Sequence, residues 1–384
     1  QGVDRTAGIW TANFDVAWEA DVWGKFSRGV EAADANLAAN MLNYDAVLVT
    51  LTGDVAALYA SIRALQERLD YAYTNVKLQQ QALDLANSRF ELGATSELDV
   101  QQARGLFYNT QSLIPIFELN IERAVNALSF LLGMPPSNLD TLLGSSRKIP
   151  AAPATVAVGI PADLLRRRPD VRAAEMAAAA QSASIGISQA ELYPSFVLAG
   201  SLGLAGGSFS DLFDGGATTG FITPFFKWNI FNYGRIKNNV RVQDARFEQA
   251  ITTYQNTALA AAKEVQDGLQ GFLRTQEQVG HLSDAVVASK RAAELALAQY
   301  RQGAADYTRV LNTQTALLQQ QDTLTAARGQ VVTNLVSTYK ALGGGWQLRE
   351  GSNYVKPDLI DTMMDRTDWG ELLSTPGQAT SANK

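Results

Sequence analysis

The side chains that could do chemistry in this chain are mainly carboxylates, because its 384 residues include no cysteine and a single histidine, His281. Thiolate nucleophiles, disulfides and cysteine-bound metals are therefore excluded, and neither a His-dependent triad nor a multi-His metal site can be assembled. The sequence also contains no glycine-rich phosphate loop. We therefore expect no enzyme, no cofactor and no bound metal.

Several of these carboxylates alternate with apolar side chains in the stretch NFDVAWEADVWGK, residues 13–25. The odd, polar positions are Asn13, Asp15, Glu19 and Asp21, and the even positions begin with Phe14, Val16 and Trp18. Two later stretches alternate in the same way, one through Phe196 and Leu198 and one through Phe226 and Trp228. Period two predicts strands, and about ten residues is the length that spans a membrane in a barrel. A half-buried sheet in a soluble protein fits the same alternation.

The composition narrows the class of protein. Hydrophobic residues make up 46% of the chain and charged residues 18%, and the net charge is -6. This balance argues against nucleic acid as a partner, because few phosphates could be neutralised. No run approaches the roughly 18 apolar residues that a membrane-spanning helix needs.

An internal repeat organises the elements around these strands. At an offset of 210 residues, without gaps, the matches include Trp18 with Trp228, Gly24 with Gly234, Gly93-Ala94 with Gly303-Ala304, and Leu132-Gly133 with Leu342-Gly343. We therefore expect a first repeat over 1–160, a second over 161–345 and a C-terminal tail over 346–384. Roughly the first 50 residues of the first repeat are expected to precede Gln1, by arithmetic on the offset.

Each repeat predicts one very long helix, from Gly24 to Phe90 and from Gly234 to Tyr300. Apolar residues follow an uninterrupted heptad spacing from Leu37 to Val76. At ~1.5 Å per residue, each helix would be roughly 95–100 Å long. A glycine turn and a return helix of about 35 residues follow in each repeat, and a further helix is predicted from Pro169 to Leu192.

The predicted strands are too few to close a barrel within one chain. A complete subunit would supply four, whereas about eight is the usual minimum, and an open sheet leaves unpaired edges. We therefore expect several subunits to share one barrel that continues as a cylinder of helices. In that arrangement the even positions face lipid, and Asn13, Asp15, Glu19 and Asp21 line water.

Several motifs resemble one family. They are GIPADLLRRRPDVRAAE at 159–175, ELYPSF at 191–196, the two glycine turns, and ALGGGW at 341–346. Together they resemble the TolC/OprM-like outer-membrane efflux proteins, in particular the NodT-type lipoprotein branch. The resemblance implies a homotrimer in the Gram-negative outer membrane, with a 12-stranded barrel and a periplasmic α-barrel. It further implies a passive exit duct for small-molecule drugs that docks to a periplasmic adaptor and an inner-membrane proton-driven RND pump. A lipid anchor would need a cysteine ahead of Gln1.

The resemblance places a gate at the glycine turns. Tyr300 matches the tyrosine of a hydrogen-bond link that holds similar channels closed. Arg309 and Asn312 stand where TolC-type channels have two Asp, and Thr308 and Asn312 stand where OprM-type channels have Leu and Asp. Asp306 and Asp99 are near enough in sequence to pair with Arg309, and Gln102 completes the expected gate. Alternatively, Arg309 points into solvent at a helix start.

The same turns are the expected docking site for the adaptor. The residues concerned are Leu92, Gly93, Ala94, Thr95, Gln302, Gly303, Ala304 and Ala305. Small side chains permit close backbone approach, although simple turn chemistry would require the same glycines.

Two other functions use the same patterns. The architecture could serve as the outer-membrane channel of a type I protein secretion system. A soluble coiled-coil scaffold or adaptor would also show the long heptad helices, provided that the strands were water-soluble.

Overall fold

The computed structural model describes residues 8–137, 139–153, 166–349 and 354–367. It divides into two compact units, one of residues 1–43 and 170–257 and one of residues 44–169 and 258–384. Each unit takes residues from both expected repeats. The expected C-terminal tail is described only in part, because 350–353 and 368–384 lie outside the described residues, as do 154–165 of the linker.

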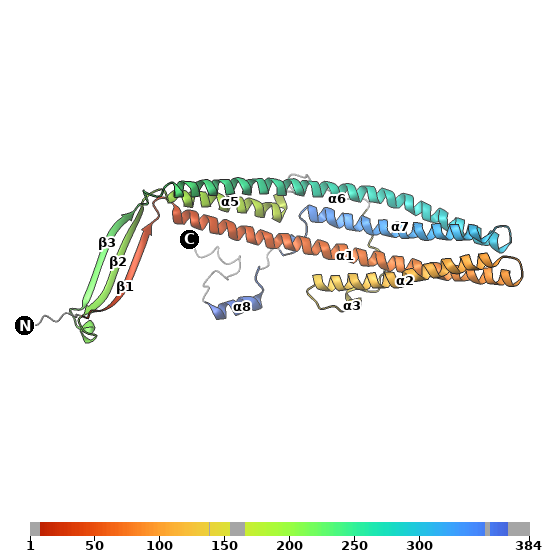
Figure 1. The fold of residues 1–384 in the computed structure, drawn as a ribbon, viewed down its shortest axis with the longest axis horizontal. Coiled ribbons are helices and arrows are strands. Elements are labelled where there is room, and N and C mark those ends of the chain that lie inside the picture. The colour runs from red at the N-terminus through yellow and green to blue at the C-terminus, as the bar shows by residue number, and fades with distance from the viewer. Residues whose placement is uncertain (1–7, 138, 154–165, 350–353, 368–384) are drawn as a thin grey trace, which may run out of the picture. The chain divides into compact units, whose positions relative to one another are not determined.

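The first unit contains one antiparallel sheet in the order β1-β2-β3 (Figure 1). Its strands are β1 (Trp10–Ala20), β2 (Ser195–Gly206) and β3 (Thr218–Lys227), and a short 3₁₀ helix, η1 (Ser210–Phe213), lies between the last two. The three predicted strands of about ten residues are therefore confirmed. Strands β1 and β3 are the edges of this sheet.

The register places the predicted apolar side chains on one face. Trp18 pairs with Leu198, and Phe196 pairs with Phe226. Because side chains alternate along a strand, Phe14 and Val16 share this face with them. All seven strand positions predicted to face lipid are exposed, namely Phe14, Val16, Trp18, Phe196, Leu198, Phe226 and Trp228.

Two residues assigned to the sheet lie beyond its strands. Asp21 follows β1 and caps the next helix, accepting hydrogen bonds from the amides of Phe26 (3.0 Å) and Ser27 (2.9 Å). Trp228 follows β3 and donates its indole N–H to the carbonyl of Leu192 at 3.0 Å. Strand alternation therefore assigns a face to neither residue, whereas Asn13, Asp15 and Glu19 lie within β1, opposite the apolar face.

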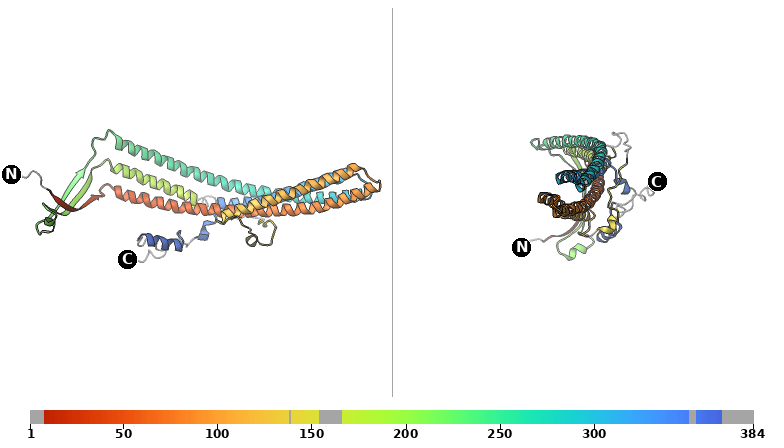
Figure 2. Two further views of the ribbon diagram at one scale, coloured as in Figure 1. Left: turned by 60° about the horizontal axis from the view of Figure 1, so that its bottom comes forward. Right: turned by 90° about the vertical axis from the view of Figure 1, so that its right-hand side faces the viewer.

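The long helices form two sets, and the helices within each set have equal lengths. Helices α1 (Lys25–Glu91) and α6 (Arg235–Arg301) contain 67 residues each, and α2 (Glu97–Leu131) and α7 (Tyr307–Ala341) contain 35 each. In the first unit, α5 (Pro169–Ala190) lies between the first part of α1 and the first part of α6 (Figures 1 and 2). Gly186 of α5 permits this approach, since an added Cβ would lie 3.1 Å from the Arg28 side chain.

In the second unit, α1 pairs with α2 and α6 pairs with α7 (Figure 1). Apolar clusters at three levels hold the helices, and the bidentate pair of Arg68 with Asp322 links α1 to α7 at 2.5 and 3.0 Å. Shorter elements complete the unit: α3 (Asp140–Leu143), η2 (Trp346–Arg349) and α8 (Pro357–Arg366). Arg349 of η2 bonds to the buried Asp45 of α1 at 2.8 Å.

One stretch of α1 is long and apolar enough to cross a membrane by composition. The expectation that no run approaches this hydropathy is therefore wrong. A single such stretch is weak evidence of a spanning helix, because core helices of soluble proteins meet the same criterion.

Candidate functional site

The candidate site consists of the two turns that join the paired helices of the second unit. Gly93 and Gly303 adopt φ of +71° and +76°, a left-handed conformation that strains any residue with a Cβ. Each glycine closes its helix: the Gly93 amide donates to the carbonyl of Phe90 at 2.9 Å, and the Gly303 amide donates to that of Tyr300 at 3.0 Å. Glycine is therefore required here by the backbone alone.

The helices that leave the turns begin with different caps. Asp306 precedes α7 and accepts the backbone N–H of Arg309 at 3.2 Å. Ser96 precedes α2 without a side-chain cap, while Thr95 donates a short hydrogen bond to Asp99. The carboxylates at the two turns therefore have different roles.

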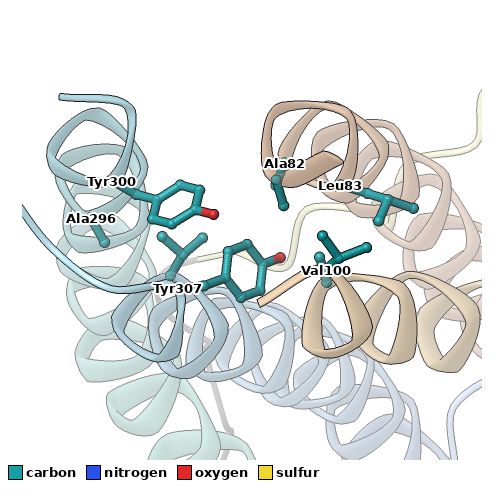
Figure 3. Close-up of a cluster of buried hydrophobic side chains, with 9 residues drawn as sticks. Ala82, Leu83, Val100, Ala296, Tyr300 and Tyr307 are labelled. Carbon is teal, nitrogen blue, oxygen red and sulfur yellow. The ribbon is translucent and has the colours of Figure 1, made fainter. Parts of the chain in front are cut away.

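Tyr300 and Tyr307 form the centre of the site. Their rings meet edge to face, with centroids 5.3 Å apart, and their exposed fractions are 1% and 0%. Figure 3 shows both rings projecting from α6 and α7 toward Ala82 and Val100. The turns are thus joined by a buried aromatic pair that packs against the opposite helix pair.

The hydroxyl groups of these tyrosines have different surroundings. That of Tyr300 donates to Asp99 across 3.4 Å, whereas that of Tyr307 is buried with no partner among the described residues. Burial raises the pKa of Tyr300, and the Asp99 charge adds to this effect while a hydrogen bond with Thr95 opposes it. Burial also raises the pKa of Tyr307, more strongly, and the neighbouring Tyr300 reinforces it. Both phenols therefore remain neutral at physiological pH.

Arg89 of α1 is the residue of this site that the sequence analysis missed. Its guanidinium lies 4.8 Å from the ring centroid of Tyr300. It donates to the carbonyl of Tyr300 at 2.7 Å and to that of Ala94 at 3.3 Å, so one side chain contacts both turns. The available signal was its place near the end of a helix, where a cation stabilises free carbonyls.

The expected salt-bridge latch is not present within the described chain. The guanidinium of Arg309 donates to the side chain of Gln299 at 3.3 Å, and the ion pairs found among the described residues include none of Arg309. The Asp306 carboxylate is instead occupied by a backbone amide. Thr308, Arg309 and Asn312 are exposed, so the structure separates them from the buried link of Tyr300 with Asp99. Gln102 is half-buried, and its side-chain oxygen has no partner in the described part of the chain.

The expected docking residues lie on the surface of the turns. Leu92 is 82% exposed, and the others that are exposed are Gly93, Ala94, Gln302, Gly303 and Ala304. Thr95 and Ala305 are half-buried. His281 is exposed on α6, and no cluster of three or more metal-ligating side chains occurs within the described ranges.

Comparison with known proteins supplies the family. A protein-family model described as "Outer membrane efflux protein" matches residues 1–134 and 160–344 of this chain. The chain belongs to the outer membrane efflux protein family. Its function is that of an outer-membrane exit duct of an efflux system, extending into the periplasm of a Gram-negative bacterium. The family consists of channel proteins for transport.

Individual relatives agree with this assignment. The chain is 32% identical to the pyoverdine export outer membrane protein OpmQ of Pseudomonas putida over 347 residues, which cover 90% of this chain and 72% of that protein. Nodulation protein T of Rhizobium leguminosarum is 31% identical over 352 residues, which cover 90% and 71%.

Solved structures share the fold. The outer-membrane channel OprN superposes with a TM-score of 0.85 at 29% identity, covering 89% of this chain and 81% of that one. CusC superposes with a TM-score of 0.80 at 27% identity, covering 90% and 80%. Like these channels, the chain is mostly helical with a smaller sheet.

Proposed function

We propose that three copies of this outer membrane efflux protein share one transmembrane barrel of twelve strands, continued by a periplasmic cylinder of helices built from two repeats per chain. The observation that carries this proposal is the sheet itself. It has one layer, an exposed apolar face and two edges in the described chain. In lipid, an open edge would leave backbone groups unpaired, so neighbouring copies must complete the sheet.

The two glycine turns form the periplasmic gate of this channel. The hydrogen bond from Tyr300 to Asp99 and the contacts of Arg89 hold the two helix pairs together at that end. Arg309 and Asn312 are exposed in one subunit and would meet their symmetry copies near the channel axis. A ring of arginines repels itself, and the bond to Gln299 is the contact that restrains it here.

The exposed surface of the turns docks to a periplasmic adaptor, which couples the channel to an inner-membrane RND pump. The exposed Leu92 side chain offers an apolar contact, and the exposed glycine and alanine residues of the turns permit close approach of a partner's helices. We propose small organic molecules as the cargo, in line with the names of a pyoverdine exporter and a toluene efflux protein among the relatives, which also include a cation efflux protein.

The proposal is tested in a strain that lacks its own outer-membrane efflux channels. The full protein should restore resistance to organic solvents and antibiotics, and it should run as a trimer in detergent after chemical crosslinking. A protein that stays monomeric in both membrane extracts and lipid nanodiscs would contradict the shared barrel.

Two different variants test the gate and the docking site separately. Replacing Arg309 and Asn312 together with alanine should raise single-channel conductance, whereas unchanged conductance would remove them from the gate. Gly303→Trp, in the turn that follows α6, should abolish resistance while the trimer persists. The control is Gly280→Ala within α6, where an added Cβ meets open space. Retained resistance in Gly303→Trp would contradict docking at this turn.

A further inference from the structure

The face of the sheet opposite the apolar one carries a regular pattern in the described strands. Strand β1 contributes carboxylates, β2 contributes small side chains and β3 contributes phenyl rings. The register gives Asp15 opposite Ser201 and Ser201 opposite Phe221, then Glu19 opposite Val197 and Val197 opposite Phe225. These two rows therefore run from an acid through a smaller residue to a phenylalanine, and the row between them consists of Ala17, Ala199 and Thr223.

A strip of smaller side chains lies between the acid column and the phenyl column, and we call this strip with its two columns the trough. Strands lie about 4.8 Å apart, so acid and phenyl columns are separated by roughly 10 Å, and the two rows lie roughly 13 Å apart along the strands. Ala199 and Ser201 form the floor. At one end the Asn13 side chain lies over Gly203, where an added Cβ would clash with its amide oxygen.

The phenyl rings are unusual for this face. Phe221 is 60% exposed and Phe225 is 48% exposed, although neither shares the face of Phe226 that the proposed channel turns to lipid. Neither ring makes an aromatic contact with another described residue. Lipid contact therefore does not account for them, and exposed phenyl faces attract cations and apolar groups.

The charges of the trough are acidic. Asp15 makes no ion pair with any residue that the structure describes, and Glu19 has one weak pair, with Lys25 at 3.9 Å. Lys227 shares this face but lies at the end of β3, in the row of Ser195. The row of Asp15 and Phe221 thus offers an unneutralised carboxylate facing a phenyl ring.

We propose that this trough is a binding site for organic cations that carry an aromatic or otherwise bulky apolar body. The ammonium or phosphonium centre lies toward Asp15 and Glu19, and the apolar body lies over Ala199 and Ser201 against Phe221 and Phe225. This inference rests on the proposed function, in which this face lines the water-filled lumen of the barrel. The site therefore favours hydrophobic cations among the compounds that pass through the channel.

The test measures binding of tetraphenylphosphonium to the full protein in nanodiscs by equilibrium dialysis, corrected with empty nanodiscs. Tetraphenylborate supplies the same body with the opposite charge, and tetramethylammonium supplies the charge without the body. Tetraphenylphosphonium should bind at least tenfold more tightly than either. Asp15→Asn and Phe221→Thr should each weaken it by about fivefold, the magnitude of one charge or cation–π contact near water.

Ile222→Thr is the matched control, because it makes a similar change on the opposite face of the same strand. Equal weakening by Ile222→Thr, or equal binding of tetraphenylborate, would overturn the site. If Phe221→Thr does not assemble, Phe221→Leu keeps the apolar volume and should still weaken binding, since the π face is lost. A conducting trimer without this preference overturns the inference alone, whereas failure to form any channel overturns the proposed function.

Discussion

Replacing Arg89 with alanine tests whether one side chain holds the two turns together. The change removes charge-assisted hydrogen bonds to the carbonyls of Tyr300 and Ala94, at 2.7 and 3.3 Å, and a contact with the Tyr300 ring. A hydrogen bond from a charged group contributes about 1.5–3 kcal/mol and an exposed cation–π contact about 0.5–1 kcal/mol. The bond to Ala94, at 3.3 Å, is long and is left out of the sum, so the expected loss in the free energy of local opening is about 2–4 kcal/mol.

Hydrogen exchange at the turns measures this loss directly. The amides of Gly303 and Ala304 donate to the carbonyls of Tyr300 and Gln299, and both hydrogen bonds break when the turn opens. A loss of about 2 kcal/mol predicts roughly thirtyfold faster exchange of these amides in Arg89→Ala. Arg89→Lys should fall between it and the wild type, because a lysine ammonium lacks the planar fork and stacks less well.

Arg301→Ala is the matched control, since Arg301 is the exposed last residue of α6 and its change leaves the same backbone in place. Exchange in Arg301→Ala should stay within about twofold of the wild type, as expected for an exposed surface charge. If Arg89→Ala and Arg301→Ala accelerate exchange equally, the assignment of Arg89 as the link between the turns is refuted.

Three further predictions concern the same region. Tyr307→Phe should leave the melting temperature unchanged or raise it, because it removes a buried hydroxyl with no described partner. A decrease of more than about 1 kcal/mol in the free energy of unfolding would contradict this, since it would show that the hydroxyl is hydrogen-bonded. Burial raises the folded-state pKa of Tyr300 and Tyr307 above 10. The stability that the two neutral phenols contribute is therefore complete below pH 10 and is lost as the pH rises through their folded-state pKa values. Tyrosinate absorbance should accordingly increase together with unfolding in an alkaline titration. Gly303→Ala should destabilise the turn by about 1–2 kcal/mol in thermal unfolding because φ is +76°, whereas Gly280→Ala should stabilise α6 by up to about 1 kcal/mol.

Local periodicity was sufficient to predict the elements. Heptad spacing and the glycine turns predicted helices that begin and end within a residue or two of α1, α2, α6 and α7. Alternation predicted the three strands and a shared apolar face, because side chains two residues apart point to the same side of any strand. The same rule also failed at strand ends, since it could not show that Asp21 caps a helix and that Trp228 bonds to a carbonyl.

The sequence by itself determined the lengths of the helices, the two turns and the faces of β1, because each depends on neighbours within a few positions. Only the tertiary structure decided which residues from distant parts of the chain meet. Arg89 contacts Tyr300 across 211 positions, while the guanidinium of Arg309 bonds to Gln299 and forms no ion pair with the expected carboxylates. The trough likewise required the register of three strands, because Asp15 and Phe221 share a row only when Ser201 lies between them. Packing selects such contacts from many that spacing alone permits.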